Sequence, residues 1–154
     1  MTRWFFEPGH TSAEFRARHM MVSWVRGFFK NISGTLEFDP AAPEKGRVEV
    51  SIDARTLWTG EPERDEHLRS ADFLDVARCP TIDFRSTRVK LSGEHEYAVL
   101  GDLTIRCVTK PVTLHVLYHG RWSCPWWEGG VDRGPVMRAG FLAKTVIQRH
   151  DFGV

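Results

Sequence analysis

The sequence predicts an all-β fold, an extended antiparallel up-and-down β-barrel with one short helix near one end. About seven segments alternate apolar and polar residues, which is the pattern of half-buried strands. Several segments are long and are interrupted by glycines such as Gly27 and Gly34, as a strongly curved sheet requires. Helical spacing appears only between Arg64 and Leu74. A sandwich of two sheets is the alternative, and the long, glycine-kinked strands favour the barrel.

Alternating side chains define the strands in chain order. Phe15 and Ala17 share one side of the first strand, while Arg16 and Arg18 share the other. The run Met20–Trp24 breaks this alternation and predicts a bend before a long second strand. Strands are predicted over residues 12–19, 25–38, 47–53, 82–91, 97–105, 112–118 and 141–147.

The helical stretch is the exception to this pattern. Leu68, Ala71 and Leu74 recur at spacings of three and four. Glu61-Pro62-Glu63 supplies the acidic residues and the proline that favour a helix start, and Pro80 stops the helix. A single helix among strands predicts a cap over one end of the barrel.

Two features separate strands in the C-terminal half. Lys110-Pro111 is expected to end the strand that begins at Tyr97. Residues Cys124–Pro135 are predicted to form a long loop, with tryptophans crowded between Trp122 and Trp127. These aromatics can form a portal, a membrane-touching tip, a protein contact or a lid, and the sequence does not choose among them.

Length and charge limit the classes of function. The 154 residues suit a single domain, residues 1–154, with its own core. Lys and Arg total 21 and Asp and Glu total 20, so the near-zero net charge removes the usual electrostatic case for a nucleic-acid or anionic-membrane partner. No stretch approaches the ~20 apolar residues of a membrane span, so no integral membrane segment is expected.

The cysteines and the N-terminus predict a compartment. Cys79, Cys107 and Cys124 are an odd number without paired spacing, which favours reduced thiols. Residues 1–10 hold too few apolar side chains for the core of a signal peptide. A cytoplasmic location is expected, or a periplasmic one if the native N-terminus was replaced.

Six motifs in order along the chain resemble those of the bacterial YceI-like proteins, a lipocalin-like group associated with polyisoprenoid binding. The resemblance implies a single YceI-like barrel domain whose apolar tunnel holds a long-chain isoprenoid or similar amphiphile, such as a polyprenyl phosphate or an isoprenoid quinone. Storage or transport of this lipid would need neither catalysis nor a cofactor. The motifs are His19–Phe29, Arg64–Phe73, Pro80–Thr87, Gly101–Ile105, Val108–Val112 and Arg149–Gly153.

One departure from the family bears on assembly. YceI-like proteins usually continue past the Asp-Phe-Gly motif, here Asp151–Gly153, for another strand. If that strand is absent by nature, the barrel has an unpaired edge that a partner chain could complete. A homodimer is then expected. Cys107, where glycine is common in the family, is a second departure.

The candidate ligand-binding residues are apolar side chains of inward parity together with their neighbours on the helix. In a small barrel the same side chains can simply fill the core, and the family resemblance favours the ligand-binding interpretation. Phe84→Asp is expected to abolish lipid retention. The set comprises Phe15, His19, Met21, Phe28, Ile52, Leu68, Phe73, Phe84, Leu103, Val112 and Phe141.

Polar groups near the helix start are candidates for the ligand's head. Arg64 and His67 could face a phosphate or a quinone at the helix N-terminus. An internal pairing of Arg64 with Asp65, pinning the helix over the barrel end, is the favoured alternative.

Catalytic and metal sites are not expected. No nucleophile motif such as G-x-S-x-G is present. His115 and His119 share a strand face but are too far apart in extended chain to chelate one ion. A non-enzymatic lipid carrier is therefore the first hypothesis; a small enzyme acting on such a lipid and a packed-core protein that pairs through its open edge are the alternatives.

Overall fold

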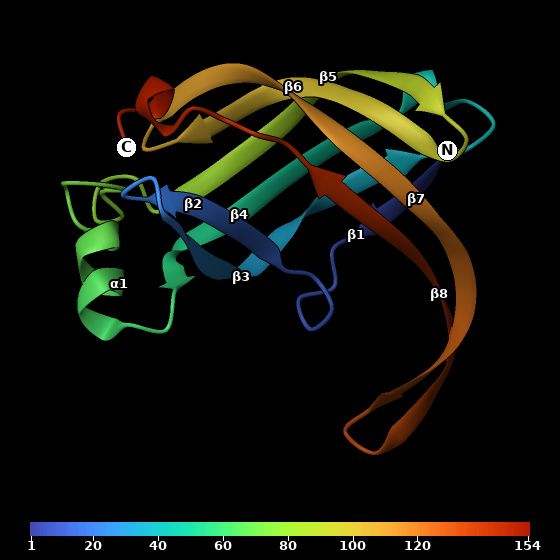
Figure 1. Ribbon diagram of the computed structural model, residues 1–154. Coiled ribbons are helices and arrows are strands. Elements are labelled where there is room, and N and C mark those ends of the chain that lie inside the picture. Colours follow the sequence, from blue (N-terminus) through green and yellow to red (C-terminus); the bar gives the residue numbers. More distant parts are fainter.

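Eight antiparallel strands form one curled sheet in the computed structural model, which describes residues 1–154 (Figure 1). The strand order is β1-β3-β4-β5-β6-β7-β8, and β2 pairs with the first half of β3. This confirms the all-β class. The strands are β1 (Thr2–Phe5), β2 (Ala13–His19), β3 (Ser23–Phe38), β4 (Arg47–Trp58), β5 (Thr81–Gly93), β6 (Glu96–Ile105), β7 (Val108–Glu128) and β8 (Val131–Lys144).

The sheet is a half-barrel that stays open along one side. β8 pairs only with β7, whereas β1 and β2 pair only with β3, so no strand pairing joins the two edges of the sheet. Across the opening, the Arg138 guanidinium of β8 contacts the Glu7 carboxylate between β1 and β2, at 3.5 Å. The register of β3 shifts twice between Phe28 and Ile32, and such bulges bend and twist a strand. Gly34 has φ 142°, and a Cβ there would collide with the Glu49 carbonyl oxygen. The predicted glycine kink therefore lies where only glycine fits the close approach of β4.

The helix α1 (Pro62–Arg69) lies at one end of the half-barrel, as predicted (Figure 1). Glu61 caps it, accepting a hydrogen bond from the Glu63 N–H at 3.4 Å. It ends much earlier than Pro80, because the Ser70 N–H bonds back to the His67 carbonyl oxygen at 3.1 Å in extended backbone. Residues 70–79, here called the plug, continue as turns over the end of the sheet.

Two predictions about the C-terminal half are wrong. Pro111 lies inside β7, opposite Asp102, and the β6–β7 turn comes earlier, at Arg106 and Cys107. The expected loop of residues 124–135 is instead the end of a long β7–β8 hairpin. β6 accompanies β7 only as far as Leu117, so residues 121–139, here called the arm, project as a two-stranded ribbon (Figure 1).

The prediction of three reduced thiols is also wrong. Cys79 and Cys107 form a disulfide with their Cα atoms 5.7 Å apart, and only Cys124 is free. The two cysteines are 28 positions apart in the sequence, and only the fold brings the start of β5 beside the β6–β7 turn. The Arg106 guanidinium also donates to the Phe73 carbonyl oxygen of the plug. The plug is therefore covalently tied to the sheet that it covers.

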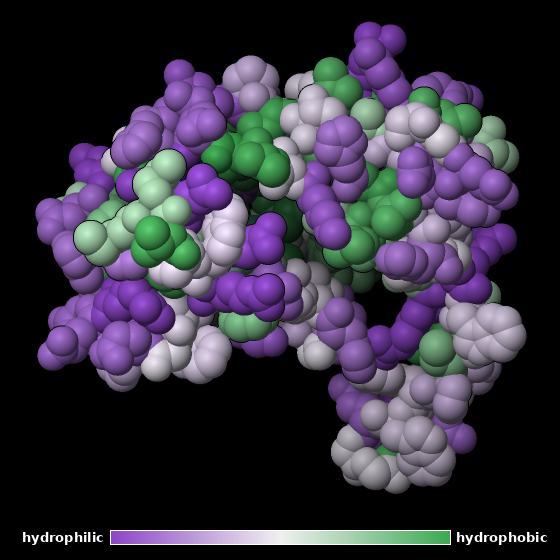
Figure 2. Space-filling model, viewed as in Figure 1, coloured by the Kyte–Doolittle hydropathy of each residue, from purple (hydrophilic) through white to green (hydrophobic).

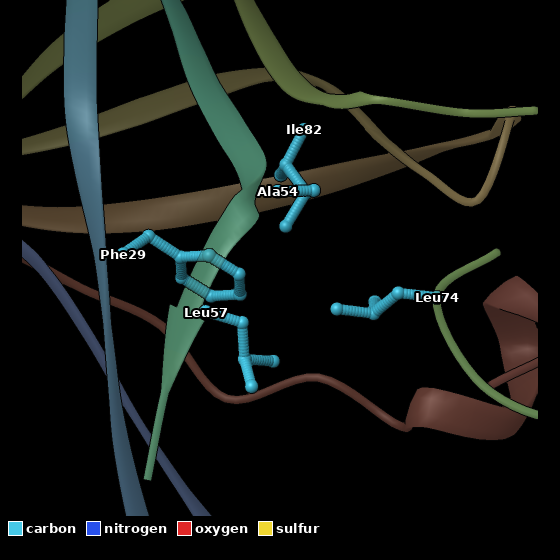
Figure 3. Packing of buried hydrophobic residues seen from close by; sticks show 5 residues of the cluster. All are labelled: Phe29, Ala54, Leu57, Leu74 and Ile82. Carbon is cyan, nitrogen blue, oxygen red and sulfur yellow. The ribbon is translucent and has the colours of Figure 1, made fainter. Parts of the chain in front are cut away.

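Buried side chains form two clusters, here called the near cluster, at the plug end of the half-barrel, and the far cluster, toward the other end. The first lies beneath the plug, where Leu74 points toward Phe29, Leu57 and the β5 residue Ile82 (Figure 3). The second comprises Phe38, Phe84, Val89, Tyr97 and Val99. None of the helices is both long and apolar enough to cross a membrane.

Burial of Tyr97 makes stability sensitive to alkaline pH. Burial raises the pKa of this phenol above its usual 10.0, and Tyr118 raises it further. The folded state therefore favours the neutral phenol. This contribution is complete below the unfolded-state pKa and is lost as pH rises through the folded-state pKa. Urea unfolding between about pH 8 and about pH 11 should show a steeper loss of stability than in Tyr97→Phe; identical slopes would contradict the assignment.

Candidate ligand-binding face

The inward side chains of β3–β8 form one apolar surface, here called the concave face. Register places their side chains in rows: Phe84 lies opposite Leu103, and Gly101 lies opposite Val112. Leu103 packs against both buried clusters, so the apolar surface continues from the plug end to the far end of the sheet. Figure 2 shows apolar side chains lining the central hollow of the half-barrel.

Much of this apolar surface remains in contact with solvent. The protein exposes 10541 Å², whereas a folded monomer of 17.7 kDa is expected to expose about 7,900 Å². Only 16 of 154 residues are buried, so most inward-facing apolar residues are half-covered rather than packed. The open side of the sheet and the projecting arm account for this excess.

Aromatic rings gather at the end of the concave face remote from the plug. The Phe38 ring lies 5.3 Å from that of Tyr97, 5.1 Å from that of Tyr118 and 5.4 Å from that of Phe141, all edge-on. Trp4 of β1 packs against the same cluster, and its buried indole Nε1–H has no acceptor. A buried donor without a partner is costly, so this N–H is an unsatisfied polar group in the far cluster.

Seven of the predicted ligand-binding residues contact one of the two clusters. Phe84 is a buried member of the far cluster, and Leu103 bridges both clusters. Leu68 reaches the near cluster from α1. The seven are Phe15, Ile52, Leu68, Phe84, Leu103, Val112 and Phe141.

The inward assignment is wrong for three residues. Met21 is 76% exposed in the β2–β3 turn, and His19 precedes that turn as an exposed residue rather than a core histidine. Phe28 lies on the outer face against Trp58, with ring centroids 5.9 Å apart, because its neighbour Phe29 takes the inward position. Phe73, the fourth predicted residue outside both clusters, packs edge-on against His67 at 4.9 Å.

The two polar-head candidates contact the protein itself. Arg64 donates from Nε to the Thr59 hydroxyl at 2.8 Å and from Nη2 to the Thr59 carbonyl oxygen at 3.0 Å. Thr59 in turn donates its N–H to the buried Asp65 carboxylate at 2.9 Å. His67 Nε2 lies 2.9 Å from Asp72. The Thr59 contacts fasten α1 to the end of β4, and the His67 contact joins α1 to the plug. Arg64 reaches Asp65 through Thr59 instead of pairing with it directly.

Sequence reasoning missed Trp4 and Phe38 as parts of the concave face. Phe38 stands at the end of a predicted strand, so its parity was a usable signal. The β1 strand is only four residues long and shows no clear alternation, so nothing in the local sequence marks Trp4. Its place depends on the pairing of Trp4 with Leu36 in β3.

A separate depression of about 430 Å³ lies over β4, β5 and β6 and is lined by residues that include Glu49, Asp83, Asp102 and Arg85. Its charged lining is unsuited to an apolar ligand. The concave face has the apolar composition that suits a hydrophobic ligand.

Comparisons with known proteins agree with this fold. The chain is 40% identical over 148 residues to a UPF0312 protein of Pseudomonas putida strain W619, covering 96% of this chain and 73% of the relative. A UPF0312 protein of Pseudomonas fluorescens strain SBW25 matches equally well.

Solved structures show the same architecture. The YceI protein of Campylobacter jejuni superposes with a TM-score of 0.71 at 27% identity, covering 99% of this chain and 85% of that one. Burkholderia cenocepacia BcnA superposes with a TM-score of 0.67 at 21% identity, covering 87% of this chain and 95% of that one, and supports the fold alone. The model of the YceI-like domain matches residues 4–154. The chain therefore belongs to the YceI-like family, as its motifs indicated.

Proposed function

We propose that the protein binds, stores or transports a long-chain isoprenoid or similar amphiphile without catalysing a reaction. The observation that carries the proposal is the continuous, half-covered apolar surface joining the two clusters through Leu103. Covering that surface with an apolar chain supplies free energy without any polar contact.

The energetics suit a ligand of moderate length. Burial contributes about 0.8 kcal/mol per CH₂, so about four isoprene units supply roughly 16 kcal/mol. Association costs of about 8 kcal/mol would leave micromolar affinity. Such a ligand needs no catalytic group, which favours a carrier over an enzyme acting on the same lipid.

Native mass spectrometry of the protein purified from a bacterium tests the proposal. An adduct of lipid mass that added geranylgeraniol displaces is expected. A clean apo mass, together with no binding of geranylgeraniol, would instead indicate a packed-core protein. Turnover of the bound lipid, lost on changing one inward polar residue, would identify an enzyme.

Trp4 is proposed to contact the polar head of the ligand. Its Nε1–H is the buried donor without an acceptor, and a quinone carbonyl or a phosphate oxygen would satisfy it. Arg64 and His67 are weaker candidates because both already have protein partners.

Trp4→Phe keeps the ring against the far cluster but removes the donor. Affinity for an isoprenoid quinone is expected to fall about tenfold, equivalent to about 1.4 kcal/mol. Affinity for a saturated hydrocarbon of equal length should not change, which serves as the control. Isothermal titration with both ligands measures the difference; equal losses for both would assign Trp4 to packing alone.

A homodimer is also part of the proposal. A two-stranded ribbon is marginal in water by itself, yet the arm carries Trp122 at 77% and Trp127 at 62% exposure. The β8 edge beside it has no strand partner. Pairing with a second copy would cover both features.

Size-exclusion chromatography with light scattering is expected to show a dimer. Trp122→Ser combined with Trp127→Ser should shift it to a monomer, because the exposed indoles would lose their contact. A wild-type protein that remains monomeric at high concentration would count against this interface.

The disulfide is evidence on the cellular compartment in which the protein works. A bond between Cys79 and Cys107 persists in an oxidising compartment and is uncommon in the reducing cytoplasm. We therefore favour an oxidising compartment for the working protein over the cytoplasmic location predicted from the cysteine count.

A further inference from the structure

The β2–β3 turn presents an apolar tip that the concave face does not use. Met20, Met21 and Val22 are 77%, 76% and 86% exposed. Trp24, two residues further, is 51% exposed. These four residues, here called the tip, form one local group of large apolar side chains in water, and such a group marks a contact surface.

The backbone of the turn does not explain this composition. The Val22 N–H closes the turn on the His19 carbonyl oxygen at 3.2 Å. The central residues Met20 and Met21 have φ of 49° and 64°, a conformation that Asn-Gly adopts far more readily. Two exposed methionines therefore stand where the turn geometry favours small polar residues, which points to a contact outside the folded chain.

Arginines surround the tip. The Arg16 and Arg18 guanidinium carbons lie 4.6 Å and 5.2 Å from the centre of the Trp24 ring. Arg26 lies opposite Arg16 on the neighbouring strand. None of the three is in an ion pair, and Glu14 is the only acidic residue between Ala13 and Phe29, where β2 and β3 pair.

The tip lies at the plug end of the half-barrel. The turn between β2 and β3 is on the same side of the molecule as α1 (Figure 1). Gly27 of β3 lies against Thr59, which is bonded to Asp65 of the helix. The outer face continues from Trp24 toward Phe28, which stacks on Trp58. A surface that contacts the tip would therefore lie beside one end of the concave face.

We propose that the tip docks the protein on an anionic lipid bilayer, with the methionines, Val22 and Trp24 entering the interface. The arginines would contact the anionic headgroups. Amphipathic aromatic rings favour the headgroup region, and each basic residue near such a surface adds to binding. Free arginines beside an apolar group are complementary to this surface, whereas they oppose self-association through the same tip. Docking here adds a membrane partner to the proposed ligand binding and does not depend on it.

Sedimentation with vesicles tests the proposal. The full chain is expected to bind vesicles of phosphatidylcholine containing about 30% phosphatidylserine, and to bind pure phosphatidylcholine about tenfold more weakly. Met20→Asn combined with Met21→Gly should weaken binding to the anionic vesicles about tenfold. The same variant should melt at a higher temperature, because its residues suit the turn, so weaker binding cannot be ascribed to unfolding.

Two matched variants complete the test. Arg16→Gln with Arg18→Gln should weaken binding to anionic vesicles about tenfold and leave binding to neutral vesicles unchanged. Leu91→Ser removes a side chain that is 64% exposed at the opposite end of the sheet, and it should bind like wild type.

Three results would overturn the proposal: no binding of wild type to anionic vesicles, unchanged binding of the turn variant, or an oligomer that dissociates when the turn is changed. The last result would assign the tip to a contact between copies. Retention of geranylgeraniol, measured on the same turn variant, should equal that of wild type. Loss of vesicle binding and loss of ligand binding are therefore separate outcomes.

Discussion

Phe84→Asp is expected to lower the free energy of unfolding by more than about 5 kcal/mol, beyond what most domains of this size tolerate. Phe84 is 7% exposed and belongs to the far cluster, so the substitution removes a core ring and buries a carboxylate. Loss of lipid by this variant would therefore report unfolding. The expected result is a cooperative transition shifted to low urea or absent, followed by circular dichroism.

Val112→Asp is the matched variant that isolates ligand binding. Val112 is only half-buried on the concave face, opposite Gly101, so its replacement keeps more of the folded state. The folded variant is expected to lose isoprenoid retention in native mass spectrometry, because the ligand would have to cover a carboxylate. Full retention of lipid by folded Val112→Asp would show that the ligand binds elsewhere.

Reduction of the Cys79–Cys107 disulfide is expected to lower the free energy of unfolding by about 3–4 kcal/mol. The bond closes a loop of 28 positions, and the entropy restored to the unfolded chain gives this magnitude. Reduction should destabilise the packing of the near cluster most, because the plug residue Leu74 belongs to that cluster. The far cluster depends less on the bond.

Thermal melts with and without a dithiol reductant measure this effect. A fall of the melting temperature by about 6–16 °C is expected. Cys124→Ser should melt like wild type in both conditions, since Cys124 is free. Alkylation of the oxidised protein should modify one cysteine; modification of three would show that the bond is absent.

Much of the fold could be predicted from the hydrophobic periodicity of the sequence alone. Alternation in segments such as residues 47–53 identified strands, because one face of the sheet is apolar and the other is solvated. Where a segment lacks this contrast between an apolar and a solvated face, the prediction of its secondary structure was wrong. The arm has no core beneath it, so its sequence shows the tryptophans, prolines and glycines of a loop although it forms paired strands.

The candidate site was predictable where strand parity holds and not where a turn or bulge resets it. Leu103 and Val112 follow the alternation of β6 and β7 into the concave face. Met21 and Phe28 stand beside a tight turn and a bulge, where parity counted along the sequence fails. Overall charge neutrality likewise concealed the arginines around Trp24, because only the pairing of β2 with β3 gathers them.

The open side of the half-barrel has a kinetic consequence for a long ligand. A closed tunnel must be threaded from one end, so entry slows as the ligand lengthens. Because no strand pairing closes the sheet between β8 and the β1–β2 edge, a chain bound on the concave face can enter from the side, past the Arg138–Glu7 contact. Association rates should then be nearly independent of the number of isoprene units, whereas dissociation should slow with each unit added.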